Sequence, residues 1–243
     1  MINTWYDFAW SPMVGCENGC DYCEVRDKHE DLHYDRLRGK HVPEDYKNPF
    51  KVPTFFPNRL EQPFEMIMPF APFSRNKMAA EISPDKAIVM VVPFGDLMTP
   101  SSENDWIHSI IRVCMDNPQL VFAFLTQFPE RYLLFHFPEN CWLGITLDYA
   151  YNYQRVGRLK INKNNKKYVC IEPLMGVMSH VNFSEIDFII MGAMNDPLYY
   201  AEQKWIHSIN HSKIYYKESM DKFLIPNIYS SAIGHGRNFN SVI

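Results

Sequence analysis

The sequence lacks any apolar run close to the roughly 18 residues that a membrane-spanning helix needs. Its first residues, Met-Ile-Asn-Thr-Trp, also lack the basic start of a secretory signal peptide. No internal repeat or low-complexity tract is visible. We therefore expect no membrane partner and a cytoplasmic location. In that compartment thiols stay reduced, and clustered cysteines bind metals more often than they form disulfides.

An excess of positive charge is also missing, because the 243 residues carry a formal net charge of −4. This balance gives no global case for nucleic-acid binding. One stretch departs from it, since residues 155–167 contain six basic residues and no acid. Such a stretch either contacts phosphates or forms a solvated helix end and loop, and both interpretations stay open. With 47% hydrophobic residues, the chain can build a sizeable core.

Short apolar runs alternate with helix-compatible segments, which predicts parallel βα units. We expect one domain over residues 1–243, an α/β fold that forms a full or partial parallel (β/α) barrel with its site at the strand C-termini. Residues 39–51 and 56–84 are Pro-rich and predict an irregular insertion near the N-terminal third. The predicted strands are Thr4–Trp10, Val52–Phe56, Ala87–Pro93, Leu120–Leu125, Cys141–Leu147, Tyr168–Glu172, Asp187–Gly192 and Lys213–Lys217. The predicted helices are Glu24–Arg38, Ser102–Met115 (capped by Ser102), Pro129–Phe135, Tyr149–Lys160 and Pro197–Asn210.

Cysteines are few, and three of the six lie together after the first predicted strand, as Cys16, Cys20 and Cys23. A C-x₃-C-x₂-C triplet offers three thiolates from one loop and no fourth. Structural zinc sites use four ligands, whereas an iron–sulfur cluster with one open iron uses three. The spacing therefore favours such a cluster, with a zinc site completed by a distant residue as the alternative. The isolated Cys114, Cys141 and Cys170 are expected to be buried small hydrophobes, although one of them could donate a hydrogen atom to a substrate radical.

A second metal motif follows the triplet, because His29, Glu30 and His33 match H-E-x-x-H. On a helix, the two imidazoles would lie on one face and bind zinc, with the glutamate as general base of a metalloprotease. The extended form of the motif is missing, since Arg36 and Gly39 occupy the positions of its later Gly and His. The segment is dense in charge, which instead favours a solvated helix face.

Polar residues end several of the predicted strands, where a barrel places its binding groups. Helix capping is the alternative role for Thr126, Thr146 and Asp148. A carboxylate at Asp96 is suited to bind an ammonium group. Glu172 and Lys217 could line the pocket, with a surface pair of Lys217 and Glu218 as the alternative. These candidates are Asp96, Thr126, Gln127, Thr146, Asp148, Glu172 and Lys217.

The triplet has Tyr22 before its third cysteine, and this C-x₃-C-x-(aromatic)-C form resembles the signature of radical S-adenosylmethionine (SAM) enzymes. Over nearly its whole length, the chain resembles a phage and bacterial family of unknown function within that superfamily. That family is in turn similar to spore photoproduct lyase, a DNA-repair enzyme. The landmarks are Trp10-Ser-Pro, Gly15-Cys16, Asn58-Arg-Leu-Glu-Gln-Pro63, Gly95-Asp96-Leu, Leu125-Thr, Pro129-Glu-Arg, Asn140-Cys-Trp-Leu-Gly144, Glu172-Pro-Leu and Lys217-Glu-Ser.

The resemblance implies a barrel of radical SAM type in which Cys16, Cys20 and Cys23 hold a [4Fe–4S] cluster whose fourth iron binds SAM. Glu172 and Lys217 would be catalytic and face the substrate. The SAM-binding candidates are Tyr22, Asp96, Thr126, Gln127 and Thr146. Family analogy gives a nucleic acid or nucleotide as the substrate class, and such enzymes take electrons from a donor such as flavodoxin or ferredoxin.

Two departures from these relatives are visible. Gln127 stands where relatives tend to have lysine, and residues 91–95 lack the cysteine of spore photoproduct lyases. A non-catalytic iron–sulfur or zinc protein, such as a phage factor acting on a partner, is therefore the alternative to an enzyme.

Overall fold

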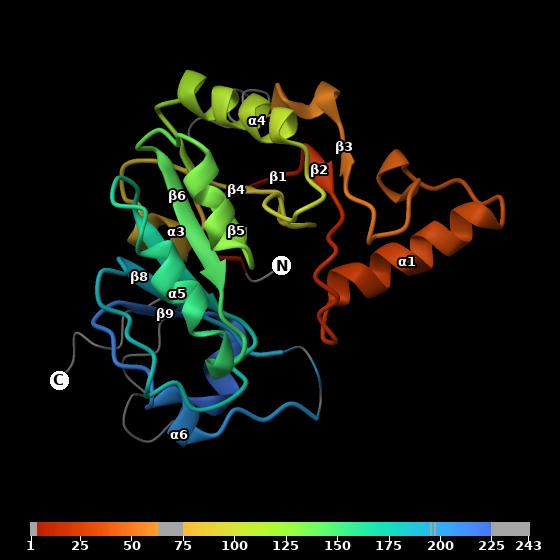
Figure 1. The fold of residues 1–243 in the computed structure, drawn as a ribbon. Helices are drawn as coiled ribbons and strands as arrows, with labels where there is room; N and C mark the ends of the chain where they lie inside the picture. The colour runs from red at the N-terminus through yellow and green to blue at the C-terminus, as the bar shows by residue number, and fades with distance from the viewer. Residues whose placement is uncertain (1–3, 63–74, 195, 197, 225–243) are drawn as a thin grey trace.

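Seven strands form one parallel sheet in the computed structural model, which describes residues 4–62, 75–194, 196 and 198–224. The sheet curls into a half-barrel, and each strand pairs with the one that follows it among these seven in the sequence (Figure 1). This confirms the predicted α/β fold at the level of a partial parallel barrel. The strands, in sheet order, are β1 (Phe8–Trp10), β4 (Ile88–Val91), β5 (Val121–Thr126), β6 (Cys141–Thr146), β7 (Lys167–Ile171), β8 (Phe188–Met191) and β9 (Ile214–Tyr216).

Helices and one small ribbon surround this sheet. The ribbon pairs two short strands, β2 (Met13–Val14) and β3 (Thr54–Phe55), in antiparallel fashion. The α-helices are α1 (Glu24–Leu37), α3 (Lys77–Ile82), α4 (Asn104–Asp116), α5 (Gln154–Leu159) and α6 (Gln203–Ile206). The 3₁₀ helices are η1 (Glu44–Tyr46), η2 (Pro57–Arg59), η4 (Pro129–Leu134), η5 (Ala150–Asn152) and η6 (Glu218–Phe223). No helix within the described ranges is long and apolar enough to cross a membrane.

Several predicted elements differ from the observed ones. The predicted barrel strand Val52–Phe56 is wrong, because β3 pairs with β2 outside the main sheet, and β2 therefore separates β1 from the cysteine loop. The segment predicted to be irregular contains α3, whose apolar Met78, Ala79 and Ile82 are buried. The predicted helices 129–135, 149–160 and 197–210 are reduced to η4, to η5 with α5, and to α6. Pro63 and Pro197 lie outside the described residues.

The predicted cap of the α4 helix is also wrong. The cap residue is Glu103, whose side chain makes no capping hydrogen bond. The Ser102 hydroxyl instead lies 3.5 Å from the sulfur of Met13 and is buried. The contact of Ser102 with Met13 of β2 therefore replaces the predicted capping hydrogen bond to α4.

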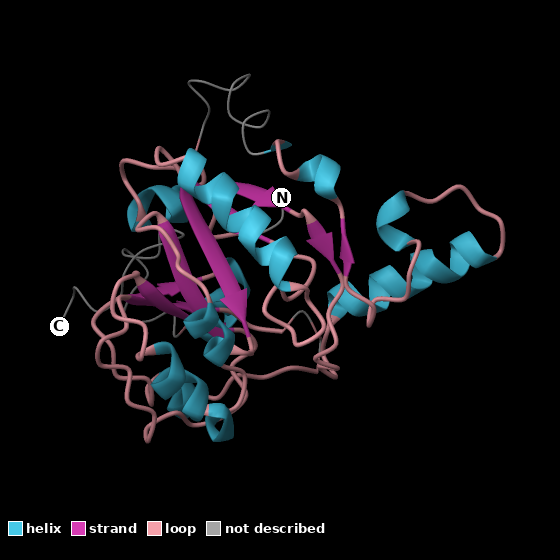
Figure 2. Cartoon of the chain, turned by 45° about the horizontal axis from the view of Figure 1, so that its top comes forward, coloured by secondary structure: helices cyan, strands magenta, loops and turns pink. Residues whose placement is uncertain are grey.

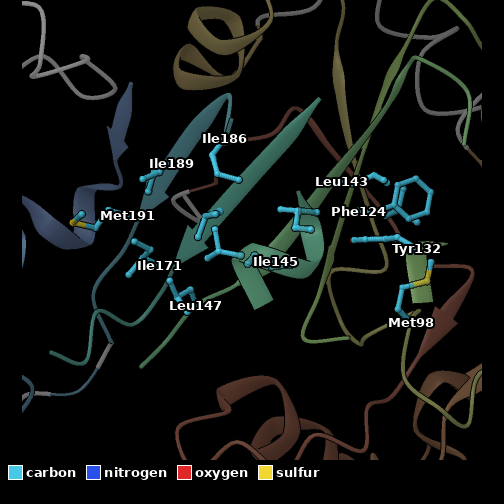
Figure 3. Packing of buried hydrophobic residues seen from close by; sticks show 14 of the residues in the cluster. Met98, Phe124, Tyr132, Leu143, Ile145, Leu147, Ile171, Ile186, Ile189 and Met191 are labelled. Atoms are coloured by element: carbon cyan, nitrogen blue, oxygen red, sulfur yellow. The ribbon is translucent and has the colours of Figure 1, made fainter. Parts of the chain in front are cut away.

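Both faces of the sheet are buried, which explains why the strands are apolar throughout. Helices α4 and α5 lie over one face, where alternate strand residues join a continuous core (Figures 1 and 2). Figure 3 shows part of this core, with Phe124, Leu143, Ile145 and Ile171 from successive strands. The opposite face packs against α3 and a group of aromatic rings from Trp5, Trp142, Tyr168 and Phe188.

One glycine is required by that aromatic packing. A Cβ atom on Gly144 of β6 would lie 2.2 Å from the ring of Tyr168 on β7. The ring cannot retreat easily, because it stacks on Phe188 at 5.2 Å and its hydroxyl donates to the Phe124 carbonyl at 2.8 Å. This packing sets how β6 and β7 approach each other below their C-terminal ends.

Candidate site at the C-terminal edge of the half-barrel

A cavity of about 270 Å³ lies at the C-terminal ends of the central strands. All three cysteines of the triplet line it, together with side chains from four different strand ends. Of the residues that the sequence singled out, those on the cavity wall are Cys16, Cys20, Tyr22, Cys23, Asp96, Thr126, Gln127, Thr146 and Glu172. Lys217 joins them through Glu172, to which its ammonium donates at 2.5 Å. The fold thus brings together residues that span 202 positions of sequence, from 16 to 217.

The cysteine loop begins at a close contact between two glycine backbones. Gly15 has a φ of +105° and forms a parallel bridge with Gly95. A Cβ on Gly95 would lie 2.4 Å from the Gly15 carbonyl oxygen, and one on Gly15 would lie 2.8 Å from the oxygen of Phe50. Only glycine allows this approach, which fixes the loop to the turn after β4.

The loop ends where α1 begins. The sulfur of Cys23 caps this helix by accepting a hydrogen bond from the Arg26 amide at 3.3 Å. The sulfur of Cys16 accepts one from the Asn18 amide at 3.4 Å. Burial raises the pKa of the Cys16 thiol to about 12 and also raises the pKa of Cys23. In the metal-free chain these two thiols are therefore neutral at pH 7, and binding a metal would release their protons.

Asp96 is buried and accepts four hydrogen bonds from the protein. Its Oδ1 accepts from the Thr126 hydroxyl at 2.7 Å and from the Met98 amide at 3.0 Å. Its Oδ2 accepts from the Asn18 side chain and from the Gln127 amide, both at 3.0 Å. Burial raises its pKa, against the effect of these hydrogen bonds. Direct contact of Asp96 with SAM stays a prediction, and in this arrangement the carboxylate joins the cysteine loop to the end of β5.

Asp148, which follows β6, holds the cysteine loop through a hydrogen bond from Tyr22. The Tyr22 hydroxyl donates to its Oδ2 at 2.6 Å, and Arg155 forms an ion pair with its Oδ1 at 3.2 Å. Burial works to raise the pKa of this carboxyl, but hydrogen bonds from Tyr22, the Asn152 side chain and the Tyr149 amide hold it below its usual range. Asp148 is therefore charged and linked to the loop.

The turn after β4 carries backbone strain beside the cavity. Val92, a β-branched residue, has a φ of +53° and precedes Pro93. Residues of this type rarely adopt the left-handed region, and such strain costs about 1–3 kcal/mol. The Val92 amide donates to the Trp10 carbonyl at 2.7 Å, which helps to hold the turn. This turn aims Asp96 toward the loop.

Glu172 and Lys217 directly follow β7 and β9 and form a half-buried ion pair, with side chains 30% and 16% exposed. Glu172 lines the cavity and Lys217 pairs with it, which favours a pocket role for Lys217 over the alternative of a surface pair with Glu218. Burial acts to lower the pKa of Lys217, but the Glu172 charge outweighs it and the net pKa is raised. The buried Cys170 thiol lies 3.9 Å from Glu172, and burial raises its pKa above its usual range.

A family model described as "Protein of unknown function (DUF5131)" matches residues 2–215. The chain belongs to this family. No curated protein and no solved structure matches it. Within the described residues of this DUF5131 member, no group of three or more His, Cys, Asp or Glu side chains is arranged to hold a metal ion.

The two histidines of the H-E-x-x-H motif in this family member are buried, whereas Glu30 is partly exposed, so the prediction of a solvated face is wrong for the imidazoles. His29 Nε2 lies 2.9 Å from the Asn48 carbonyl oxygen, and His33 Nδ1 lies 2.9 Å from that of Tyr46. A nitrogen that faces a carbonyl oxygen carries the proton and has no lone pair for a metal. The Glu30 carboxylate accepts from the Phe50 amide at 2.8 Å. These contacts attach the segment around η1 to α1, which extends away from the sheet (Figure 1), and they favour a structural role for the motif.

The basic stretch 155–167 has internal partners for its charges. Three members form ion pairs: Arg155 with Asp148, Arg158 with Glu130 and Lys163 with Glu185. The ammonium groups of Lys160 and Lys167 donate to backbone carbonyls, and Lys166 lies 4.2 Å from the centre of the Trp142 ring. These contacts favour the structural interpretation of the stretch over phosphate binding.

Two residues of the site could not be found from the sequence. Asn18 lies between the cysteines, and Arg155 belongs to the basic stretch, so neither stood out by its type or spacing. The side-chain NH₂ group of Gln127 donates to the sulfur of Cys20 at 3.0 Å, and Arg155 donates to the side-chain oxygen of Gln127 at 2.8 Å. Such pairings depend on strand order and not on local pattern.

Proposed function

We propose that this chain is a radical SAM enzyme whose [4Fe–4S] cluster is held by Cys16, Cys20 and Cys23. The supporting observation is that the three thiols line one cavity together with polar side chains from four strand ends of a curled parallel sheet. Ligands and reactive groups meet at this edge in parallel barrels.

The donor set fits such a cluster in type and number. A single ion needs all its thiolates within about 2.3 Å, whereas a four-iron cluster takes one thiolate on each of several irons. Three thiols leave one iron open for a small ligand. Each of the three sulfurs also accepts a hydrogen bond from an N–H group, and such bonds tune iron–sulfur clusters.

When bound, the cluster and SAM would supply a one-electron cleavage that yields methionine and a 5′-deoxyadenosyl radical able to abstract hydrogen. The chain itself supplies a largely apolar wall, to which Val25, Phe50, Met90 and Leu125 contribute. These side chains exclude water from the space beside the cysteine loop. At the end of β7, Glu172 is oriented by Lys217 and would present a carboxylate to a substrate.

The proposal includes Tyr22, Asp96, Thr126, Gln127 and Thr146 as the SAM-side wall and a flavodoxin or ferredoxin as the electron donor. A nucleic acid or nucleotide as substrate stays a prediction from family analogy. The basic residues 155–167 have internal partners, so phosphate contacts would have to come from elsewhere in the chain.

A non-catalytic cluster protein is the second candidate, and one observation favours it. The side-chain amide of Gln127 lies on the cavity wall but is already hydrogen-bonded to Cys20 and Arg155, so it offers little to SAM in this arrangement. Such a protein would bind the cluster and leave SAM intact.

The test is anaerobic reconstitution of the full chain with iron and sulfide, followed by addition of dithionite and SAM. We expect a brown absorption, about four irons per chain, and release of 5′-deoxyadenosine. Cys20→Ala should abolish all three results. Cys114→Ala, a buried cysteine outside the loop, is the matched control and should retain them.

The other outcomes separate the alternatives. A loaded cluster without 5′-deoxyadenosine would favour the non-catalytic protein. A colourless chain that contains only zinc would overturn the proposal, and loss of that zinc in His29→Ala would favour the H-E-x-x-H site.

A further inference from the structure

Three side chains from consecutive strand ends hold the cysteine loop at alternate residues. Asp96, after β4, accepts from Asn18; Gln127, after β5, donates to Cys20; and Asp148, after β6, accepts from Tyr22. The three strands are neighbours in the sheet in this same order. Residues 18, 20 and 22 of the loop therefore face the edge of the sheet one after another. We call these three hydrogen bonds the loop clasp.

The middle bond of the loop clasp differs from the outer two because it ends on a cysteine of the triplet. The sulfur of Cys20 accepts from a side chain of another element, at 3.0 Å. The sulfurs of Cys16 and Cys23 accept from backbone amides close by in the sequence. Their hydrogen bonds move with the loop, while the one to Cys20 is anchored to the sheet.

Gln127 is itself held at both ends. Its backbone amide donates to Asp96 at 3.0 Å, and its side-chain oxygen accepts from Arg155 at 2.8 Å. Arg155 in turn donates to the Thr146 carbonyl at 3.0 Å and to Asp148 at 3.2 Å. The side-chain amide of Gln127 therefore cannot rotate by a half-turn without bringing its NH₂ group against the guanidinium donors of Arg155. Its NH₂ group is thereby directed at Cys20.

We propose that Gln127 is a positioning residue that fixes Cys20 in the metal-free loop and that supports the Cys20 thiolate once a cluster is bound. The first half needs only the contacts described above, whereas the second half rests on the proposed function. A donor to a ligating sulfur stabilises negative charge there, and the reduced cluster carries more of it. The amide of Gln127 therefore makes the bound cluster easier to reduce.

Hydrogen exchange on the metal-free full-length chain tests the first half. Gln127→Leu removes the donor without adding charge, and Gln127→Glu keeps the length and the Arg155 partner but also lacks the donor. Loss of one hydrogen bond of about 0.5–1.5 kcal/mol predicts exchange of the 16–23 amides faster by about threefold to tenfold in both variants. The matched control is Gln119→Leu, an exposed glutamine that bonds to Asn117 within its own turn, and it should leave the loop unchanged.

The reduction potential of the reconstituted cluster tests the second half. At a fixed electrode potential near the wild-type midpoint, Gln127→Leu should lower the ratio of reduced to oxidised cluster by about threefold to tenfold, where tenfold corresponds to about 59 mV. A purely structural role for Gln127 would change the yield of cluster and leave this ratio unaltered.

The outcomes are distinguishable. If wild-type protein loads a cluster and releases 5′-deoxyadenosine, but both exchange and potential are unchanged in Gln127→Leu, the inference is overturned and the proposed function stands. If wild-type protein loads no cluster, but exchange rises in both Gln127 variants, the positioning of Cys20 is supported and the proposed function falls. Unchanged exchange with a shifted potential overturns the positioning half alone.

Discussion

Replacing Asp96 with alanine removes the acceptor at which the cysteine loop, the turn after β4 and the end of β5 meet. Four donors lose their partner: the Asn18 side chain, the Met98 amide, the Thr126 hydroxyl and the Gln127 amide. The Thr126 side chain is itself buried, so its hydroxyl has little access to water as a replacement.

The magnitude follows from these donors. Each buried donor left without a partner costs about 1–3 kcal/mol. Two of the four hydrogen bonds, from the Thr126 hydroxyl and the Met98 amide, are fully buried, so their loss alone costs about 2–6 kcal/mol. We expect Asp96→Ala to lose about 3–5 kcal/mol of unfolding free energy. At about 2–4 °C per kcal/mol for a chain of this size, the melting temperature should fall by about 6–20 °C.

The assay is urea unfolding of the metal-free chain, followed by circular dichroism, beside thermal melting. Asp116→Ala, at the exposed end of α4, is the control and should stay within about 0.5 kcal/mol of wild type. A loss below about 1 kcal/mol in Asp96→Ala would refute the reasoning, because it would mean that water satisfies these donors as well as the carboxylate does.

Three further predictions concern neighbouring contacts. Tyr22→Phe removes the donor to Asp148 at 2.6 Å and should cost about 1–3 kcal/mol in urea unfolding, whereas Tyr34→Phe on exposed α1 should have no measurable effect. Gly144→Ala places a methyl group against the Tyr168 ring and should cost about 1–3 kcal/mol; an unchanged melting temperature would contradict the packing argument. Arg59 lowers the pKa of Asp45 by hydrogen bonding. The stability from this pair is therefore fully present above the pKa that Asp45 has in the unfolded chain, and it is lost as the pH falls through the lower pKa that Asp45 has in the folded chain. Asp45→Asn should therefore flatten the acid limb of a stability-against-pH curve, and an unaltered limb would count against the pair.

Elements whose apolar pattern agrees with their burial could be predicted from the sequence. The strands from β4 to β9 and the charged helix α1 are found close to their predicted bounds. The short β3 strand could not be placed from the sequence. Its local pattern is that of a barrel strand, but it pairs with β2 outside the main sheet. Ser102 has the chemistry of a helix cap, but its hydroxyl is directed into the core toward Met13.

The sequence by itself determined which residues are candidates for the site, namely the three loop cysteines and the polar residues that end the strands. Residue type and spacing suffice for that, since thiolates select their metals and strand ends converge in parallel sheets. Only the tertiary structure decided the partners: Asp96 holds Asn18, Gln127 holds Cys20 and Asp148 holds Tyr22. These pairs join residues 78, 107 and 126 positions apart. Such contacts depend on strand order and on the path of the loop across the sheet, which no local pattern of residues encodes.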